Sequence, residues 1–435
     1  MTGLQFSFIT YIPLTKFSSP VHLLKGKMAT LSRVVRIGAP KGQEFAGLIY
    51  LSQRHKSTNI TPSNYKRGTG GRSSFNGNVV TIFGAKSCLG FHVVNKLAKV
   101  GTQVICAYRG DSYFLRDLKL MGDLGQVLFC EVNLRNEDSL RQAMKHSNCV
   151  VNLIGKNFET RNWSFDEVHV EGPRSLAKIA AECGVDKFIH VSALNAGKES
   201  NNIVSGGSKF LRTKYEGELA VREEFPEATI IRPSDFCDVN DKFTRYYGSK
   251  SRSTMYPVFN ILDISDTFAR YMNLWKLGLE TVKMPVKTDD VAKALVNAVF
   301  DPNIHGNTYQ TVGPYAYCQF DLVEFVLHTM NLDWTIRKMG LTDQVKAAVR
   351  EQVYKTIGFP MPKVTRDMLE RETVSDSLDR KLHTIQDLGV TPGNIEDHLI
   401  EVYAPLRRRH LGNKLMFPKH PGKVQHAFRT LKQET

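Results

Sequence analysis

The sequence predicts an α/β fold, a doubly wound parallel sheet followed by a smaller, mainly helical C-terminal lobe. Two observations predict the sheet: short β-branched runs alternate with helical stretches from Asn78 onward, and a glycine-containing turn follows the first run. A third predicts the lobe, because strand signals thin out after Pro314 and helical stretches dominate. A length of 435 residues exceeds one ordinary domain of about 100 to 200 residues.

Six apolar runs are predicted to form the sheet. They span residues 79–83, 103–108, 126–132, 149–154, 187–192 and 229–232. Helices are predicted between them at 89–100, 139–144, 173–184 and 208–224, where Pro173 suits a first turn and Gly184 a helix end. In such a sheet the ligand crevice lies beyond the carboxyl ends of the strands, so functional residues are sought there.

The C-terminal lobe is predicted to cover these strand ends. Its helices are expected at residues 320–331, 342–355, 365–372 and 395–403, and they offer no cluster of acid, base and nucleophile. The predicted organisation is a leader at 1–60, a linker at 61–77, a nucleotide-binding domain at 78–314, the helical lobe at 315–404 and a basic tail at 405–435.

The formal charge of +15 gathers at the two ends of the chain. Residues 1–72 carry +10 and residues 405–435 carry +7, whereas the remainder sums to −2. A nucleic-acid-binding domain would present a basic stripe on its folded face, and the sequence has no such motif, so no nucleic-acid partner is predicted. The most apolar early stretch, residues 4–14, falls short of the roughly 20 residues that a membrane span needs.

The leader has the composition of a mitochondrial presequence. It is rich in Ser, Thr, Lys and Arg, poor in acid, and residues 28–36 place apolar and basic side chains on opposite helical faces. We therefore expect a cleaved presequence followed by a disordered stretch. A merely disordered basic arm is the alternative.

The cysteines predict neither disulfides nor a metal site. The seven cysteines are scattered, without any Cys-x-x-Cys pair, which is typical of buried thiols in a reducing compartment. Zinc would want clustered ligands, so none is predicted.

The loop Gly84-Ala-Lys-Ser-Cys-Leu-Gly90 lies between a strand and a helix, where backbone amides and the helix dipole can hold a pyrophosphate. Gly84 permits the tight turn and Gly90 lets the helix pack against the strand. Ser87 stands where a glycine would bring the backbone nearest to the phosphate, and Lys86 adds a cation. A simple packing turn is the alternative. The predicted phosphate-binding residues are Gly84, Ala85, Lys86, Ser87, Cys88, Leu89 and Gly90.

Arg109 ends the second strand, where an NAD-preferring site places an acid for the ribose 2′-hydroxyl. The guanidinium favours a 2′-phosphate, so NADPH is predicted over NADH. A local salt bridge with Asp111 is the alternative interpretation. Other strand ends are expected to contribute to the same site, through Asn133, Leu134, Ile154, Gly155 and Ser192.

From residue 79 to about 314 the chain resembles the short-chain dehydrogenases/reductases of extended or atypical type. The glycine loop, Val-Asn-Leu-Ile-Gly155, Phe-Ile-His-Val-Ser192 and Ile-Ile-Arg-Pro233 carry this resemblance, which implies a Rossmann domain and a Tyr-x-x-x-Lys dyad. Here that run is Phe210-Leu-Arg-Thr-Lys214. Phenylalanine has no transferable proton, a loss of about 10² to 10⁴ in rate, so no catalytic residue is predicted.

The remaining dyad residue and its neighbours are still expected to bind the cofactor. The resemblance implies that Lys214 holds the ribose hydroxyls and that Ser192 lines the nicotinamide pocket. A solvated helix lysine and a capping serine are the alternatives. Tyr215 is no substitute for the missing tyrosine, because it projects about 100° around the helix from Lys214.

Within that superfamily the chain is most similar to a family of NADPH-binding accessory subunits of mitochondrial respiratory complex I. Gly70-Gly-Arg-Ser-Ser74, Met-Gly-Asp-Leu-Gly125, Phe-Pro-Glu-Ala228 and Asp-Leu-Gly-Val-Thr-Pro392 carry this likeness. It implies a non-catalytic subunit with structural NADPH, other complex I subunits as partners, and a peripheral position on the matrix side of the inner membrane.

Two matters stay open at this point. The basic tail is predicted to contact anionic lipid headgroups or an acidic neighbouring subunit, with a solvated tail as the alternative. An active NADPH-dependent reductase or epimerase, drawing its acid from the 195–208 loop or from water, is the rival function.

Overall fold

The computed structural model describes residues 75–199, 207–238, 247, 271–330, 335–358, 364–403 and 421–426. These residues belong to one unit that spans residues 55–435. The predictions for the leader, for nearly all of the linker and for most of the basic tail fall outside the described residues.

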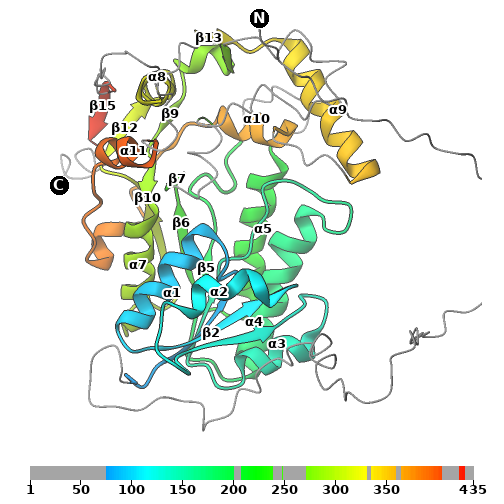
Figure 1. The fold of residues 1–435 in the computed structure, drawn as a ribbon, viewed down its shortest axis with the longest axis vertical. Coiled ribbons are helices and arrows are strands. Elements are labelled where there is room, and N and C mark those ends of the chain that lie inside the picture. Colours follow the sequence, from blue (N-terminus) through cyan, green and yellow to red (C-terminus); the bar gives the residue numbers. More distant parts are fainter. Residues whose placement is uncertain are drawn as a thin grey trace, which may run out of the picture. The chain divides into compact units, whose positions relative to one another are not determined.

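The main sheet has eight parallel strands in the order β14-β11-β6-β5-β4-β1-β2-β3 (Figure 1). This confirms the predicted doubly wound sheet, whose order reverses between β1 and β4. The strands are β1 (Val79–Phe83), β2 (Gln103–Tyr108), β3 (Val127–Glu131), β4 (Cys149–Asn152), β5 (Lys187–Val191), β6 (Thr229–Pro233), β11 (Thr308–Thr311) and β14 (His383–Thr384). Beyond the six predicted strands the sheet gains β11 and β14.

Helices cover both faces of the sheet. Alternate residues of β1 point to opposite sides: Val80 and Ile82 pack with α1 and α7, whereas Val79 and Phe83 pack with α3, α4 and α5. Figure 1 shows α1 and α7 side by side on one face. The helical elements of this part are α1 (Cys88–Lys99), η3 (Ser112–Leu115), α2 (Arg116–Lys119), α3 (Glu137–Met144), η4 (Glu167–Glu171), α4 (Gly172–Glu182), α5 (Lys209–Glu224) and α7 (Thr288–Phe300).

The C-terminal lobe holds the four predicted helices and several short strands, and it also takes in segments outside the predicted bounds of 315–404. Its helical elements are η7 (Trp275–Gly278), α8 (Gln319–Thr329), α9 (Leu341–Ile357), α10 (Arg366–Glu372), η8 (Ile385–Leu388) and α11 (Ile395–Tyr403). The strands are β7 (Phe236–Cys237), β8 (Tyr271–Leu274), β9 (Val282–Lys283), β10 (Val286–Lys287), β12 (Tyr315–Cys318), β13 (Thr335–Lys338) and β15 (Lys423–His426). A core that includes Tyr317, Phe325 and Tyr403 joins α8 to α11.

Two segments of the chain return to distant parts of the fold. β14 lies in the predicted helical lobe, yet it pairs with β11 at the edge of the main sheet. β15 lies in the predicted basic tail and pairs antiparallel with β12. No described helix combines the length and the apolar character that a membrane crossing requires.

Candidate functional site

The loop after β1 is built around two glycines that side chains cannot replace. Gly84 has a φ of +88°, and a Cβ there would lie 3.1 Å from the Leu153 carbonyl. A Cβ on Gly90 would lie 2.6 Å from the carbonyl oxygen of Gly84. These contacts bring the start of α1 against the ends of β1 and β4, at the point where the strand order reverses. A ligand crevice is expected at that point of the sheet.

Ser87 caps helix α1 and turns its hydroxyl toward the helix. Its Oγ accepts a hydrogen bond from the amide of Gly90 at 3.0 Å, and its own amide donates to the Gly84 carbonyl at 2.9 Å. The amides in the first turn of a helix have no acceptor within the helix, so they remain suited to an anion. Ser87 therefore keeps the helix start intact although its Cβ adds bulk.

A cavity of about 430 Å³ lies where α1, the strand ends and the lobe meet. Six of the predicted cofactor residues line it: Ser87, Cys88, Leu89, Gly155, Ser192 and Lys214. Residues of α10, including Arg371, close it from the lobe side. The predicted covering of the strand ends by the lobe thus has a direct counterpart in this cavity.

Lys214 and Ser192 present polar groups to this cavity. Lys214 is buried, and its Nζ donates to the Val191 carbonyl at 3.2 Å. A Cβ on Gly155 would lie 3.3 Å from that Nζ, so Gly155 leaves the lysine room. The Oγ of Ser192 is buried without a hydrogen-bond partner among the described residues. Buried hydroxyls are nearly always paired, so an orphaned one at a cavity wall fits a ligand-binding position.

The ring of Phe210 is held among aromatic and cationic groups. It makes edge contacts with Phe165 and His169, at centroid distances of 6.1 and 5.1 Å, and the Arg371 guanidinium lies 4.3 Å from its centroid. Tyr215 lies elsewhere: it is 41 % exposed and lines a separate depression near Gly197. The expected direction of Tyr215, away from the site of Lys214, agrees with this placement.

His169 on η4 lies beside the dyad position, and no motif in the sequence pointed to it. Its Nε2 accepts from the Lys156 amide at 3.2 Å, and its Nδ1 lies 3.0 Å from Thr213 Oγ1, which donates to the Phe210 carbonyl. This pattern assigns the proton to Nδ1. Burial, followed by the charge of Lys214, lowers the pKa of His169 to about 2. His169 is therefore neutral and has no proton to offer the cavity.

A second pocket of about 530 Å³ lies beyond the ends of β2 and β3. Arg109, Asn133, Arg135, Lys156 and Trp163 are among its lining residues. The guanidinium groups of Arg109 and Arg135 lie 5.4 and 4.3 Å from the Trp163 ring centroid. Burial, and then the charge of Arg109, lowers the pKa of Lys156. The pocket thus concentrates cations around an aromatic ring.

Asp111 does not neutralise Arg109 within the described part of the chain. Its side chain instead caps η3 by accepting from the Tyr113 amide at 2.8 Å. No ion pair joins it to Arg109 among the described residues. The local salt bridge that the sequence left open is therefore not formed there, and the guanidinium faces the pocket.

Four predicted residues contribute backbone or packing rather than pocket-lining side chains. Ala85 is buried in the core with α1 and β1, and Leu134 and Ile154 pack against the opposite core. The Nζ of Lys86 lies 4.1 Å from the centroid of the Phe114 ring. Their side chains line neither described pocket, so any contact they make with a cofactor would come from the backbone.

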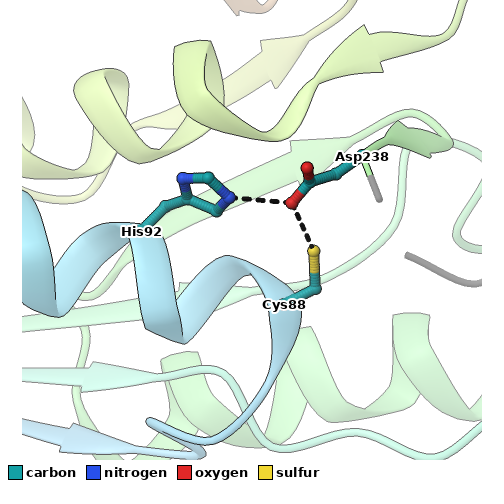
Figure 2. Close-up of side chains that lie close together, drawn as sticks. All are labelled: Cys88, His92 and Asp238. Carbon is teal, nitrogen blue, oxygen red and sulfur yellow. Dashed lines mark hydrogen bonds and ion pairs between the residues drawn. The ribbon is translucent and has the colours of Figure 1, made fainter. Parts of the chain in front are cut away.

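Sequence reasoning also missed a group at the start of α1. Cys88 and His92 meet Asp238, which follows β7, through a 3.1 Å contact between Sγ and Oδ2 and a 2.8 Å contact between Nε2 and Oδ2 (Figure 2). About 150 residues separate the helix from the aspartate, so no local spacing could reveal the group.

Comparison with known proteins gives two kinds of match. Residues 80–223 match the NAD dependent epimerase/dehydratase family. A Mus musculus protein named mitochondrial NADH dehydrogenase (ubiquinone) 1 alpha subcomplex subunit 9 is 41 % identical over 345 residues, which cover 79 % of this chain and 83 % of the relative. The mitochondrial NADH-ubiquinone oxidoreductase 40 kDa subunit of Neurospora crassa is 33 % identical over 78 % of this chain and 82 % of its own length.

Solved structures share the fold at lower identity. A Bacillus cereus UDP-glucuronic acid 4-epimerase, in complex with UDP-glucuronic acid and NAD, aligns with a TM-score of 0.53 at 15 % identity. The alignment covers 75 % of this chain and 98 % of the epimerase. At this identity the likeness establishes the fold alone.

Proposed function

Because the chain belongs to the family of the mitochondrial NADH dehydrogenase (ubiquinone) 1 alpha subcomplex subunit 9, we propose that it is a non-catalytic accessory subunit of respiratory complex I, the NADH:ubiquinone oxidoreductase. The observation that carries the proposal is Phe210, which stands in the dyad position and lines the same cavity as Ser192 and Lys214. The names of these relatives do not favour the rival reductase or epimerase.

The nucleotide of this subunit is NADPH. A nicotinamide cofactor is supported by the family match of residues 80–223 and by the NAD in the related epimerase structure. The phosphorylated form is supported by the pocket that gathers Arg109, Arg135 and Lys156. A 2′-phosphate brings about two negative charges, and arginine binds phosphate through paired, charge-assisted hydrogen bonds.

The proposed contacts run along the carboxyl ends of the strands. The first-turn amides of α1 hold the pyrophosphate, and Arg109 with Asn133 holds the adenosine end. Lys214 binds the nicotinamide ribose through its Nζ, and the orphaned Oγ of Ser192 bonds the nicotinamide side. Gly84 and Gly90 hold the loop in shape, and Ala85, Lys86, Leu134, Ile154 and Gly155 contribute backbone or space.

The proposed lack of turnover rests on the loss of the tyrosine proton donor at the position of Phe210. NADPH supplies hydride, and reduction of a carbonyl also needs a proton at its oxygen. Phe210 has none, and His169 is neutral with both ring nitrogens engaged. The Tyr247 hydroxyl reaches the cavity wall, but it donates to the Glu372 carboxylate at 3.2 Å and accepts from Gln319 at 2.8 Å. A missing general acid lowers the rate by about 10² to 10⁴.

A kinetic test separates the subunit from the rival. NADPH oxidation is followed with the full chain and a panel of aldehydes and ketones, and we expect no substrate-dependent rate. Phe210→Tyr restores a phenol four residues before Lys214 and is the variant in which turnover is expected to appear. Turnover in the unmodified chain would favour the reductase, and Tyr247→Phe would then identify the donor.

A binding test addresses the cofactor. Mass spectrometry of the ligand extracted from purified chain should find NADP(H), and native electrophoresis of mitochondrial membranes should place the chain in a large complex. Ligand linkage predicts that NADPH at a hundred times its dissociation constant adds about 2.7 kcal/mol to stability. A chain that retains no pyridine nucleotide, or that migrates alone, would contradict the proposal.

The location proposed for the subunit is the matrix side of the inner membrane, attached peripherally. The mitochondrial names of the relatives support a location in the mitochondrion. The basic tail at 405–435 supports attachment to an acidic surface, which is either anionic lipid or a neighbouring subunit. Protection of the chain from protease in intact mitochondria would test the matrix location. Release of the chain from membranes at high salt, after disruption of the complex, would test the peripheral attachment.

A further inference from the structure

The trio at the start of α1 has the composition of a zinc site. Cys88 offers a sulfur, His92 an imidazole nitrogen and Asp238 a carboxylate oxygen, and these ligand atoms all lie within 4.8 Å of one another. Figure 2 shows the three side chains pointing toward one another from α1 and from the end of β7. Sulfur, nitrogen and oxygen ligands together suit zinc, whereas calcium and magnesium prefer oxygen alone.

We propose that Cys88, His92 and Asp238 form a divalent-metal site of the zinc class, with one coordination position left to water. The inference does not rest on the proposed nucleotide binding, although Cys88 belongs to both places. It also departs from the expectation, drawn from the scattered cysteines, that the chain has no metal site.

Rotations of the three side chains are needed to admit the ion. The Asp238 Oδ2 lies 3.1 Å from Cys88 Sγ and 2.8 Å from His92 Nε2. Zinc bonds of about 2.0 to 2.3 Å in a tetrahedral arrangement separate neighbouring ligand atoms by about 3.3 to 3.5 Å. The Cys88 Sγ and the His92 Nε2 also lie within 4.8 Å of each other, so the three side chains must rotate about their own bonds to bring every pair of ligand atoms to this separation.

Helix α1 sets two of the three ligands on one face. Cys88 is the first residue of the helix and His92 follows four residues later, a spacing that stacks side chains one turn apart. The positive end of the helix dipole lies at Cys88, and it favours the thiolate that metal binding requires. A cysteine and a histidine four residues apart on a helix are common. The third ligand, Asp238 after β7, is what distinguishes this group as a candidate metal site.

A carboxylate also lies near the second ring nitrogen of His92. The Nδ1 of His92 lies 3.8 Å from Asp289 on α7, which leaves Nε2 for the ion. Asp289 is itself held by Lys96 at 2.6 Å and by Lys293 at 3.1 Å. Metal-bound histidines usually direct their second nitrogen to such a carboxylate, which fixes the ring and strengthens the ligand.

The site is partly open. The side chains of His92 and Asp238 are 26 % and 14 % exposed, so an ion can enter from solvent, and Cys88 also lines the large cavity. A metal here would join the phosphate loop to the segment after β7. Binding would require loss of the thiol proton, so affinity should rise with pH.

The experiment uses the full chain, stripped with a chelator and dialysed. Zinc chloride is titrated against a chromophoric chelator, and cobalt(II) chloride is added in parallel because a cobalt–thiolate bond gives a charge-transfer absorption. We expect one zinc per chain and a thiolate band with cobalt. Since outer partners alone contribute about 10- to 100-fold to affinity, Cys88→Ser and His92→Gln should each weaken zinc binding by more than about 100-fold.

Cys183→Ser is the matched control, because Cys183 is another partly exposed thiol, at the end of α4. It should leave the zinc affinity and the cobalt band unchanged. Circular dichroism checks that each variant folds, and the cobalt spectrum of the unmodified chain needs no variant at all. A cobalt spectrum without a thiolate band, or equal zinc affinity in Cys88→Ser and the unmodified chain, overturns the proposal.

Discussion

Ser87 and Phe210 illustrate how single side chains alter a nucleotide fold without dismantling it. Ser87 adds bulk to the phosphate loop, but its hydroxyl bonds the Gly90 amide and so caps the helix that an anion would approach. Phe210 keeps the volume of the dyad residue, and the Arg371 guanidinium packs on its ring. Ser87 is therefore compatible with nucleotide binding, whereas Phe210 removes the transferable proton of the dyad.

Arg109→Gln should separate the two nicotinamide nucleotides. A hydrogen bond to a charged group contributes about 1.5 to 3 kcal/mol, so NADPH affinity should fall about 10- to 100-fold while NADH affinity stays constant. Isothermal titration with both nucleotides measures this. Arg116→Gln is the control, because Arg116 stacks on Tyr113 outside the pocket. Equal losses for NADPH and NADH would show that Arg109 does not read the 2′-phosphate.

The stability of the chain should fall as the pH drops below about 6.5 because of its buried histidines. Burial is the main cause that lowers the pKa of His169 to about 2 and that of His190 to about 3. The unfolded chain takes up protons below a pKa of about 6.5 and the folded chain does not, so stability is lost as the pH falls. At pH 5 each histidine should account for about 2 kcal/mol of that loss.

Urea unfolding between pH 7 and pH 5 measures this dependence. His169→Gln should remove about half of the histidine contribution to the slope, whatever it does to stability at pH 7. His328→Gln, which changes a histidine that is 59 % exposed, should leave the slope as it is. An unchanged slope in His169→Gln would mean that the ring is protonated in the folded chain.

At the scale of elements, the strongest sequence signals gave the strands that surround the site. β1, β2 and β5 are short, mostly apolar runs, and their predicted and observed bounds agree to within one residue. β11 and β14 were missed, because Tyr309 is the one apolar residue of Thr308–Thr311 and because His383–Thr384 has only two residues. Such strands are recognised by their neighbours in the sheet and not by their own composition.

The residues of the candidate site also divide into those that the sequence could predict and those that it could not. Gly84, Arg109 and Lys214 lie at fixed offsets from recognisable strands, so their places could be predicted from the sequence. His169, Arg371 and Asp238 arrive from segments whose approach depends on how helices and the lobe pack. Long-range packing leaves no periodic trace in a sequence, which is why these residues were not anticipated.

Gly217→Ala should destabilise the contact between α5 and η4. Alanine favours a helix over glycine by about 1 kcal/mol, but a Cβ at this position would lie 2.0 Å from the His169 carbonyl oxygen. Overpacking costs about 1 to 3 kcal/mol, and so close an approach to backbone places this change at the upper end, so we expect a net loss of about 2 kcal/mol. Urea denaturation measures it. Glu216→Ala, at the exposed neighbouring position, should change stability by less than about 0.5 kcal/mol, and a stable Gly217→Ala variant would contradict the close approach.

Over the whole molecule, most of the excess positive charge lies outside the sheet and the lobe. The middle of the chain is nearly neutral and the basic residues gather at its ends, so the sheet and lobe form without strong self-repulsion. Part of the predicted tail is nevertheless built into the lobe, since Lys423 on β15 lies 3.5 Å from Glu396 and 4.1 Å from the Tyr315 ring. Deleting residues 405–435 would therefore remove a strand together with the charges.

Neutralising Arg407, Arg408 and Arg409 to glutamine tests the tail without removing β15. Each cation near an anionic surface contributes about 1 kcal/mol, so binding to phosphatidylcholine vesicles that contain cardiolipin should weaken by about 100-fold. Flotation measures it, with Lys99, Lys145 and Lys178 changed to glutamine as the control on the folded part. If vesicle binding is unaffected while incorporation into the large complex drops, the tail contacts an acidic subunit instead of lipid.

The pairing of β14 with β11 determines when the main sheet of this protein can be completed. The chain leaves the sheet at Thr311 and returns at His383, and Ile385 and Leu388 then enter the core that α1 and α7 share. A chain that is still emerging from a ribosome or an import channel lacks the edge strand β14 until about nine-tenths of its residues have appeared. Until then β11 exposes unpaired backbone groups of the kind that recruit chaperones or promote aggregation.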